Sequence, residues 1–192
     1  MIREAALFVM AEQVLVEVVG RIRPEHGAIV MPPPFDPPAD ARSRPLRPYV
    51  RALAQDDARL PELLAGGTPD PADSDPGPYP PIVEAACAAA SEVTDGDAVV
   101  HADSGDVTTS DFLLRTTIAR CFIANDIAMH LGSRACPLTE QLARGMWEGT
   151  EPRAAHWRLL GVFRDPLPLP PHVSWRDRFM LTAGHDPHAL DH

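Results

Sequence analysis

The stretch TSDFLLRTTIARCFIANDIAMHL, residues 109–131, decides the fold, because its apolar residues cover every side of a helix. Threonine, serine and aspartate at residues 108–111 are typical N-cap residues, and Gly132 suits the left-handed position that follows a helix. A helix that is apolar all round is buried inside a larger protein. We therefore predict a central helix over residues 109–131, around which the rest of the chain packs.

Apolar residues at helical spacing predict further helices on both sides of this segment. They span about residues 2–22, 45–64, 81–93, 138–160 and 175–182, and Gly149 and Pro152 interrupt the fourth of these. Most of the 22 prolines fall between the predicted helices and mark the connections, and only residues 97–106 look extended or hairpin-like. The predicted fold class is therefore all-α: a four-helix bundle with proline-rich connections and a short hairpin or extended interruption before the helix over residues 109–131.

Length, charge and cysteine content limit the class of protein. A chain of 192 residues suits one domain, and we expect its tail, from about residue 184, to be loosely ordered. All 17 basic side chains are arginine, and the net charge of −10 argues against nucleic acid or an anionic membrane as a partner. Three cysteines outside any C-x-x-C pair, with no signal peptide or membrane span, predict a reduced, cytoplasmic protein.

Two polar residues of the predicted central helix form a candidate acid/base pair. Asp126 and His130 lie one helical turn apart, so the carboxylate can fix the imidazole tautomer and raise its basicity. The structural interpretation is the favoured one: Asp126 pairs with Arg120 or an interhelical amide, and a protonated His130 is stabilised at the negative end of the helix dipole.

Two further carboxylates occupy the apolar stripes of the first and second predicted helices. Glu12 and Asp57 each lie in the middle of such a stripe, and a desolvated carboxylate has a raised pKa that suits proton transfer near neutrality. Alternatively, both satisfy Arg120 in the core. Pro61 lacks the N–H that would bond the carbonyl of Asp57, which predicts a bend in the helix at that point.

Four short stretches resemble the actinobacterial relatives of mycothiol-dependent maleylpyruvate isomerase, within the DinB-like metalloenzyme bundles. These stretches are residues 6–8 with 18–22, 56–66, 120–128 with 131–132, and 177–187. The resemblance implies an up-down helical bundle, a zinc or nickel ion held by three side chains, and a thiol cofactor that attacks near the metal.

The sequence departs from the family at the metal ligands. The resemblance places the ligand of the second helix at Leu53 and the ligand pair of the fourth helix at Ala119 and Ile123. None of these side chains can bind a metal ion. We therefore expect no metal and no cofactor in this chain.

These observations predict a small-molecule site between the first, second and fourth helices of the bundle. Its acid/base groups would be Glu12, Asp57, Asp126 and His130, and its lining would include Leu53, Thr116, Ala119, Arg120 and Ile123. The favoured hypothesis is a metal-independent enzyme that isomerises, cyclises or adds to a small, largely apolar metabolite. One alternative is a non-catalytic protein that binds a small molecule or docks a partner, and the other is a mycothiol-dependent metalloenzyme. A homodimer is left open.

Overall fold

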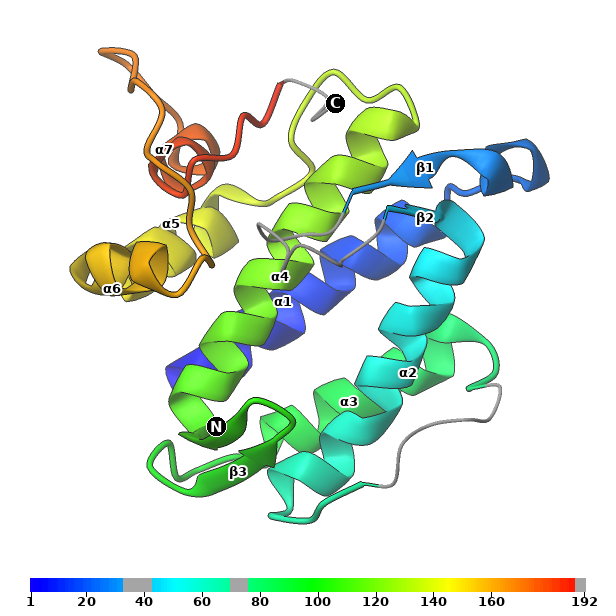
Figure 1. The fold of residues 1–192 in the computed structure, drawn as a ribbon, viewed down its shortest axis with the longest axis vertical. Helices are drawn as coiled ribbons and strands as arrows, with labels where there is room; N and C mark the ends of the chain where they lie inside the picture. Colours follow the sequence, from blue (N-terminus) through cyan, green and yellow to red (C-terminus); the bar gives the residue numbers. More distant parts are fainter. Residues whose placement is uncertain (33–42, 70–75, 189–192) are drawn as a thin grey trace.

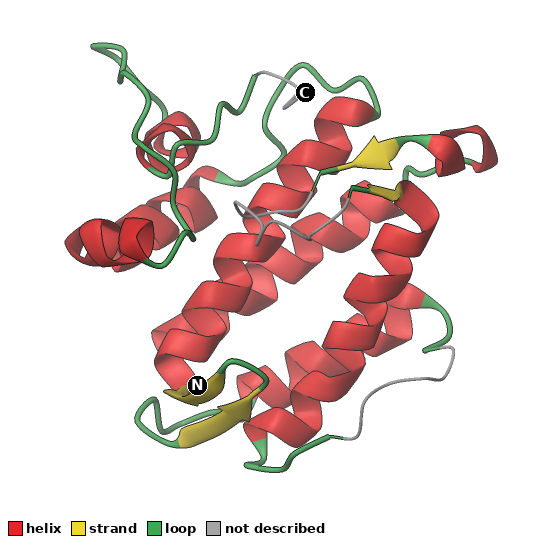
Figure 2. Cartoon of the chain, viewed as in Figure 1, coloured by secondary structure: helices red, strands yellow, loops and turns green. Residues whose placement is uncertain are grey.

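The computed structural model describes residues 1–32, 43–69 and 76–188, and its fold is all-α, as the sequence predicts (Figures 1 and 2). The long helices are α1 (Arg3–Val19), α2 (Leu46–Leu64), α3 (Tyr79–Ser91) and α4 (Thr109–His130). The shorter ones are α5 (Glu140–Thr150), α6 (Ala154–Leu159) and α7 (Trp175–Thr182), with 3-10 turns η1 (Pro24–Ala28) and η2 (Glu151–Arg153). The strands of the described chain form two antiparallel pairs: β1 (Val30–Met31) with β2 (Arg44–Pro45), and β3 (Val99–Ala102) with β4 (Gly105–Thr108), which is a hairpin.

Helix α4 is the core of the molecule, as its composition predicts. Its residues from Arg120 to Ala128 are buried without a break, and the Thr108 hydroxyl caps its first turn by accepting a hydrogen bond from the Asp111 N–H. Gly132 closes the helix with a φ of 87°, in the left-handed region that favours glycine.

The four long helices pack in the order α2, α3, α1, α4. Helix α1 packs against α4 and α3, and α3 packs against α2. Helices α2 and α4 stand further apart from each other, and the β3–β4 hairpin contacts both of them near one end (Figure 1). Helices α5, α6 and α7 lie beside α4 on the side away from α2 (Figure 1). Helices α2 and α4 therefore pack against each other less closely than α1 and α4 or α2 and α3 do.

The hairpin and the helix boundaries differ slightly from the sequence prediction. The hairpin pairs Val99 with Thr108 and turns at Gly105, whose φ is 110°, so its second strand continues directly into α4. Helix α1 ends at Val19 rather than near residue 22, and α3 begins at Tyr79. Helix α2 continues through Pro61, and a bend near Asp57 stays a prediction.

The C-terminal segment is held against α4 at His185. This residue is buried, its ring stacks on Phe122 with centroids 4.5 Å apart, and its Nε2 lies 3.0 Å from Asp126 Oδ1. The expectation of a loosely ordered tail is therefore wrong at His185, while residues 189–192 lie outside the described residues. No helix within the described ranges is long and apolar enough to cross a membrane.

Candidate functional site

Three charged side chains meet in the interior where α1, α2 and α4 face one another. Arg120 of α4 donates through Nε to Glu12 Oε1 of α1 at 2.8 Å, and through Nη2 to Asp57 Oδ1 of α2. Both carboxylate side chains are fully buried, and 4% of the Arg120 side chain is exposed. We call these three residues the Arg120 cluster. The pairing is the one that the structural interpretation of Glu12 and Asp57 anticipated.

The environment of Glu12 makes it the titrating member of this cluster. Burial raises the pKa of the Glu12 carboxyl from its ordinary value of 4.5 to about 7, with Arg120 opposing the rise and Asp57 adding to it. The Tyr79 hydroxyl of α3 donates to Glu12 Oε2 at 3.3 Å. Glu12 therefore exchanges a proton near neutral pH while it stays hydrogen-bonded to two neighbours.

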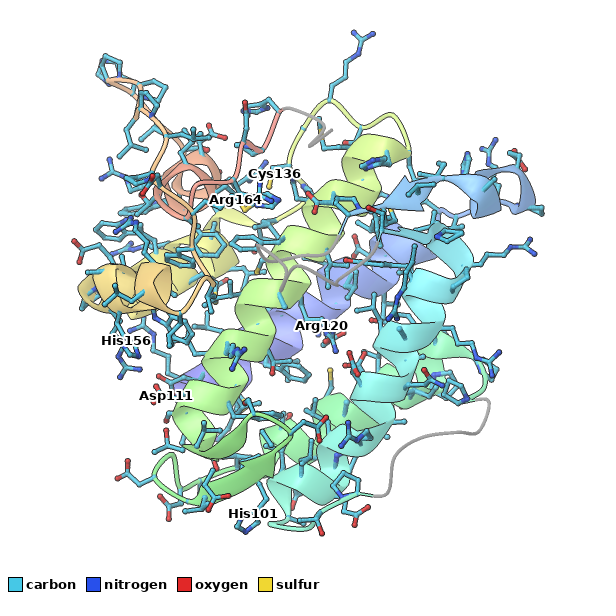
Figure 3. All side chains as sticks on the ribbon, in the orientation of Figure 1. His101, Asp111, Arg120, Cys136, His156 and Arg164 are labelled. Carbon is cyan, nitrogen blue, oxygen red and sulfur yellow. The ribbon has the colours of Figure 1, made fainter. Side chains whose placement is uncertain are left out.

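A pocket of about 640 Å³ opens between α2, α4, the β3–β4 hairpin and α6, and we call it the α2–α4 pocket. Its walls are Asp56, Arg59, Leu60 and Leu63 of α2, Ala102, Asp103, Ser104 and Val107 of the hairpin, Asp111, Phe112, Arg115, Thr116, Ala119 and Arg120 of α4, and Arg153, His156, Trp157 and Leu160. Figure 3 shows Arg120 between α4 and α2, with Asp111 and His156 nearer α6. Arg120 thus belongs to both the pocket wall and the buried cluster.

Most charges on the pocket wall neutralise one another. Arg59 forms two hydrogen bonds to Asp103, at 2.8 and 2.9 Å, which tie α2 to the hairpin. Arg153 forms an ion pair with Asp111 at the start of α4. Arg115, in contrast, has only a long contact of 3.5 Å to the Ser104 hydroxyl among the described residues. The wall therefore offers one cation, Arg115, without a carboxylate partner in the part of the chain that the structure describes.

Asp56 is the carboxylate on the pocket wall that has no ion pair among the described residues. Crowding by the surrounding protein raises the pKa of its carboxyl, and Arg120 and Arg59 oppose the rise, although the residue keeps contact with solvent. His156 of α6 also lines the pocket. These two side chains are the candidate acid/base groups of the wall that lie outside its ion pairs among the described residues.

The structure separates the residues that we expected to form one site. Thr116, Ala119 and Arg120 line the pocket, as predicted, whereas Glu12 and Asp57 lie behind Arg120 and do not reach it. Leu53 and Ile123 are buried and also lie outside the pocket wall.

The expected Asp126–His130 pair is wrong. The Asp126 carboxylate contacts His185 Nε2, and His130 Nδ1 lies 2.8 Å from the main-chain oxygen of Asp126 rather than from its carboxylate. A helical turn brings residues i and i+4 close, but the side chain of residue i can still turn to another element. Neither residue lines the α2–α4 pocket.

Several residues of the pocket were absent from the sequence-based prediction. Phe112 and Trp157 supply its large aromatic surfaces, and Arg59 and Asp103 join its two sides. One signal was available for Phe112, which lies one turn before Thr116 on the same helix side. Trp157 comes from α6, whose docking beside α4 depends on contacts that a local pattern does not contain.

The family's three-residue metal site does not fit this chain. Leu53, Ala119 and Ile123 stand where the resemblance places the ligands, and none has a donor atom for a metal ion. Within residues 1–32, 43–69 and 76–188, no three histidine, cysteine or acidic side chains come together as a metal site would require.

Comparison of the chain with protein-family models, with characterised proteins and with solved structures found no match.

Proposed function

We propose that this protein binds a small molecule with an apolar body in the α2–α4 pocket. The observation that carries the proposal is the pocket itself: about 640 Å³, with a mainly apolar surface and charged side chains that are mostly held in ion pairs. Ligand sites in proteins commonly have this size and composition, because apolar walls supply affinity and a few polar groups set orientation. Leu60, Leu63, Phe112 and Trp157 provide the apolar surface.

The geometry favours binding over the catalytic role that the sequence suggested for Glu12, Asp57 and Asp126. All three carboxylates are buried and hydrogen-bonded to a cation or a histidine. A general acid or base must come within hydrogen-bond reach of the reacting atom, directly or through one water. None of the three lines the pocket, so none reaches a ligand there without rearrangement.

Acid/base catalysis in the same pocket is the second candidate function, and Asp56 and His156 support it. They line the pocket from α2 and α6, and the pKa of Asp56 is raised by partial desolvation. If the pocket is catalytic, we expect the wild-type protein to convert a bound ligand. The Asp56→Asn variant should bind the same ligand without converting it. Recovery of unchanged ligand from the wild-type protein contradicts this candidate.

We also propose that the four long helices are a DinB-like bundle that has lost its metal site. The order of the resembling stretches along α1, α2 and α4 supports this, together with apolar residues at the ligand positions. A cytoplasmic location is part of the same proposal, supported by three cysteines that are free thiols in the structure.

Filling the pocket tests the binding proposal. The probe is 4-phenylbutyramide, a neutral compound with an apolar body, and binding is measured by titration calorimetry. Ala119→Phe places a ring in the pocket, whereas Ala58→Phe, on the exposed face of α2, serves as the matched control. We expect the Ala119→Phe variant to bind about tenfold more weakly or worse, a loss of about 1.4 kcal/mol, and the control to bind like wild type. Equal binding by both variants, or no binding by wild type, contradicts the proposal.

A further inference from the structure

Arg120 has donor capacity left on the side of the α2–α4 pocket. Its Nε and Nη2 donate inward to Glu12 and Asp57, and Nη1 has no hydrogen-bond partner among the described residues. A guanidinium carries five N–H donors in a planar fork, so two inward bonds leave donors for a further acceptor. Because Arg120 lines the pocket, that acceptor can be a group on a bound ligand.

The charge of the Arg120 cluster depends on the protonation of Glu12. With both carboxylates ionised, the cluster has one positive and two negative charges, a net charge of −1. With Glu12 protonated, the cluster is neutral, and Asp57 alone balances Arg120. A ligand carboxylate at Nη1 would be a third anion near the same guanidinium, which disfavours ionised Glu12.

Four further groups face Glu12 and keep their charge state near neutral pH: Tyr79, Cys87, Cys121 and Arg120. Tyr79 of α3 stays a neutral phenol, because burial and the nearby carboxylates raise its pKa. Cys87, also on α3, stays a thiol, since burial raises its pKa to about 12. Arg120 of α4 remains charged, because Asp57 and Glu12 raise its pKa. In the structure, the Tyr79 hydroxyl donates to Glu12 Oε2. When Glu12 is protonated, this hydrogen bond can reverse, with the carboxyl O–H donating to the Tyr79 oxygen.

The remaining charges of the pocket wall include one cation, Arg115, and one carboxylate, Asp56, without an ion-pair partner among the described residues. Arg59 and Arg153 are neutralised by Asp103 and Asp111, whereas Arg115 has no carboxylate partner among the described residues. Arg115 lies on the same helix side of α4 as Thr116 and Ala119, so its charge acts on the same space.

We propose that the α2–α4 pocket binds a small carboxylate with an apolar body, that the carboxylate accepts hydrogen bonds from Arg120 Nη1, and that binding is coupled to the uptake of one proton by Glu12. The proton comes from solvent and leaves with the ligand. This inference rests on the proposed binding function and adds to it the class of ligand and its dependence on pH.

A matched pair of probes tests the ligand class. 4-Phenylbutyrate and 4-phenylbutyramide share an apolar body and differ in the charge of the head group. At pH 6.5, below the raised pKa of Glu12, we expect the carboxylate to bind at least about tenfold more tightly than the amide. An amide that binds as tightly as the carboxylate overturns the inference.

Calorimetry in two buffers of different ionisation enthalpy counts the protons taken up on binding. Near pH 8 we expect about one proton per 4-phenylbutyrate and none per amide, and a wild-type affinity for the carboxylate that falls up to about tenfold per pH unit above pH 7. In Glu12→Gln, uptake should vanish and the affinity should no longer fall with pH. Glu17→Gln, on the exposed face of α1, is the control and should behave like wild type.

The outcomes separate this inference from the binding function on which it rests. If both probes bind equally and Ala119→Phe weakens both, the pocket binds ligands but the carboxylate assignment is overturned. If Glu12→Gln takes up as many protons as wild type, the coupling to Glu12 is overturned. If neither probe binds, the binding function and the inference both fail.

Discussion

Replacing Glu12 by glutamine should remove a pH dependence from the stability of the protein. Glutamine has the size of glutamate and can still accept from Arg120 Nε, while its amide can donate to the Tyr79 oxygen. The substitution therefore keeps the packing of a fully buried position and removes only the titration.

The expected magnitude follows from the pKa of Glu12. Because the folded protein raises this pKa from 4.5 to about 7, the folded state holds a proton that the unfolded state has already released in that interval. The contribution of Glu12 to stability is thus complete below about pH 4.5 and declines until about pH 7. At about 1.4 kcal/mol per pH unit, the decline is about 3 kcal/mol.

Urea unfolding followed by circular dichroism, at intervals from pH 4.5 to pH 7.5, measures this effect. The difference in unfolding free energy between Glu12→Gln and wild type should grow by about 3 kcal/mol in favour of the variant as the pH rises. The exposed Glu17→Gln variant should run parallel to wild type. A difference between Glu12→Gln and wild type that stays constant across this range, or that changes in the opposite direction, refutes the assignment of a protonated, buried Glu12.

Three further predictions concern the rest of the structure. Arg120→Leu leaves two fully buried carboxylates without their cation, so urea unfolding at pH 7.5 should show a loss of about 3 to 5 kcal/mol, and a loss under 1 kcal/mol would contradict the geometry of the cluster. His185→Ala removes a buried ring and leaves the Asp126 carboxylate without its histidine partner, so we expect about 2 to 4 kcal/mol less stability and faster proteolysis after α7; unchanged protease resistance would show that the His185 contact does not hold the C-terminal segment. Excess zinc or nickel should leave the thermal midpoint of untagged protein within about 1 °C, because the family's ligand positions are apolar, and a stoichiometric stabilisation would show that another site binds the metal.

The helices could be predicted from sequence because their signals are local. Helix α4 has apolar residues on all sides and cap residues at both ends, and its observed bounds differ from the predicted ones by one residue at the C-terminus. The α7 helix, Trp175–Thr182, begins after the cap residue Ser174 and matches the predicted range. In such segments, periodicity and capping point to the same structure.

The burial of Glu12 and Asp57 could also be predicted, because each interrupts an apolar stripe. Their shared partner, Arg120, was named only as an alternative, since periodicity places a residue on a face without choosing its contact across the bundle. The local pattern placed His130 one turn from Asp126 and made it a candidate partner. His185, 59 residues further along the chain, takes that position because it can stack on Phe122 and reach the carboxylate together.

The pocket itself could not be predicted, because its walls come from elements that are far apart in the sequence. The β3–β4 hairpin crosses from α4 to α2, where Arg59 and Asp103 fix it, and α6 brings Trp157 to the same space. The periodicity of a single segment does not predict the packing of the hairpin against α2 or the position of α6. Thr116, Ala119 and Arg120 were correctly assigned to the wall because they share one side of α4.

A crystal structure of the protein with 4-phenylbutyrate at pH 6.5 tests the proposed carboxylate site most directly. We expect the phenyl group in the α2–α4 pocket against Phe112 and Trp157, with the carboxylate within hydrogen-bond distance of Arg120 Nη1. A compound bound elsewhere with this pocket unoccupied, or a carboxylate in the pocket that leaves Arg120 uncontacted, would contradict the proposed site.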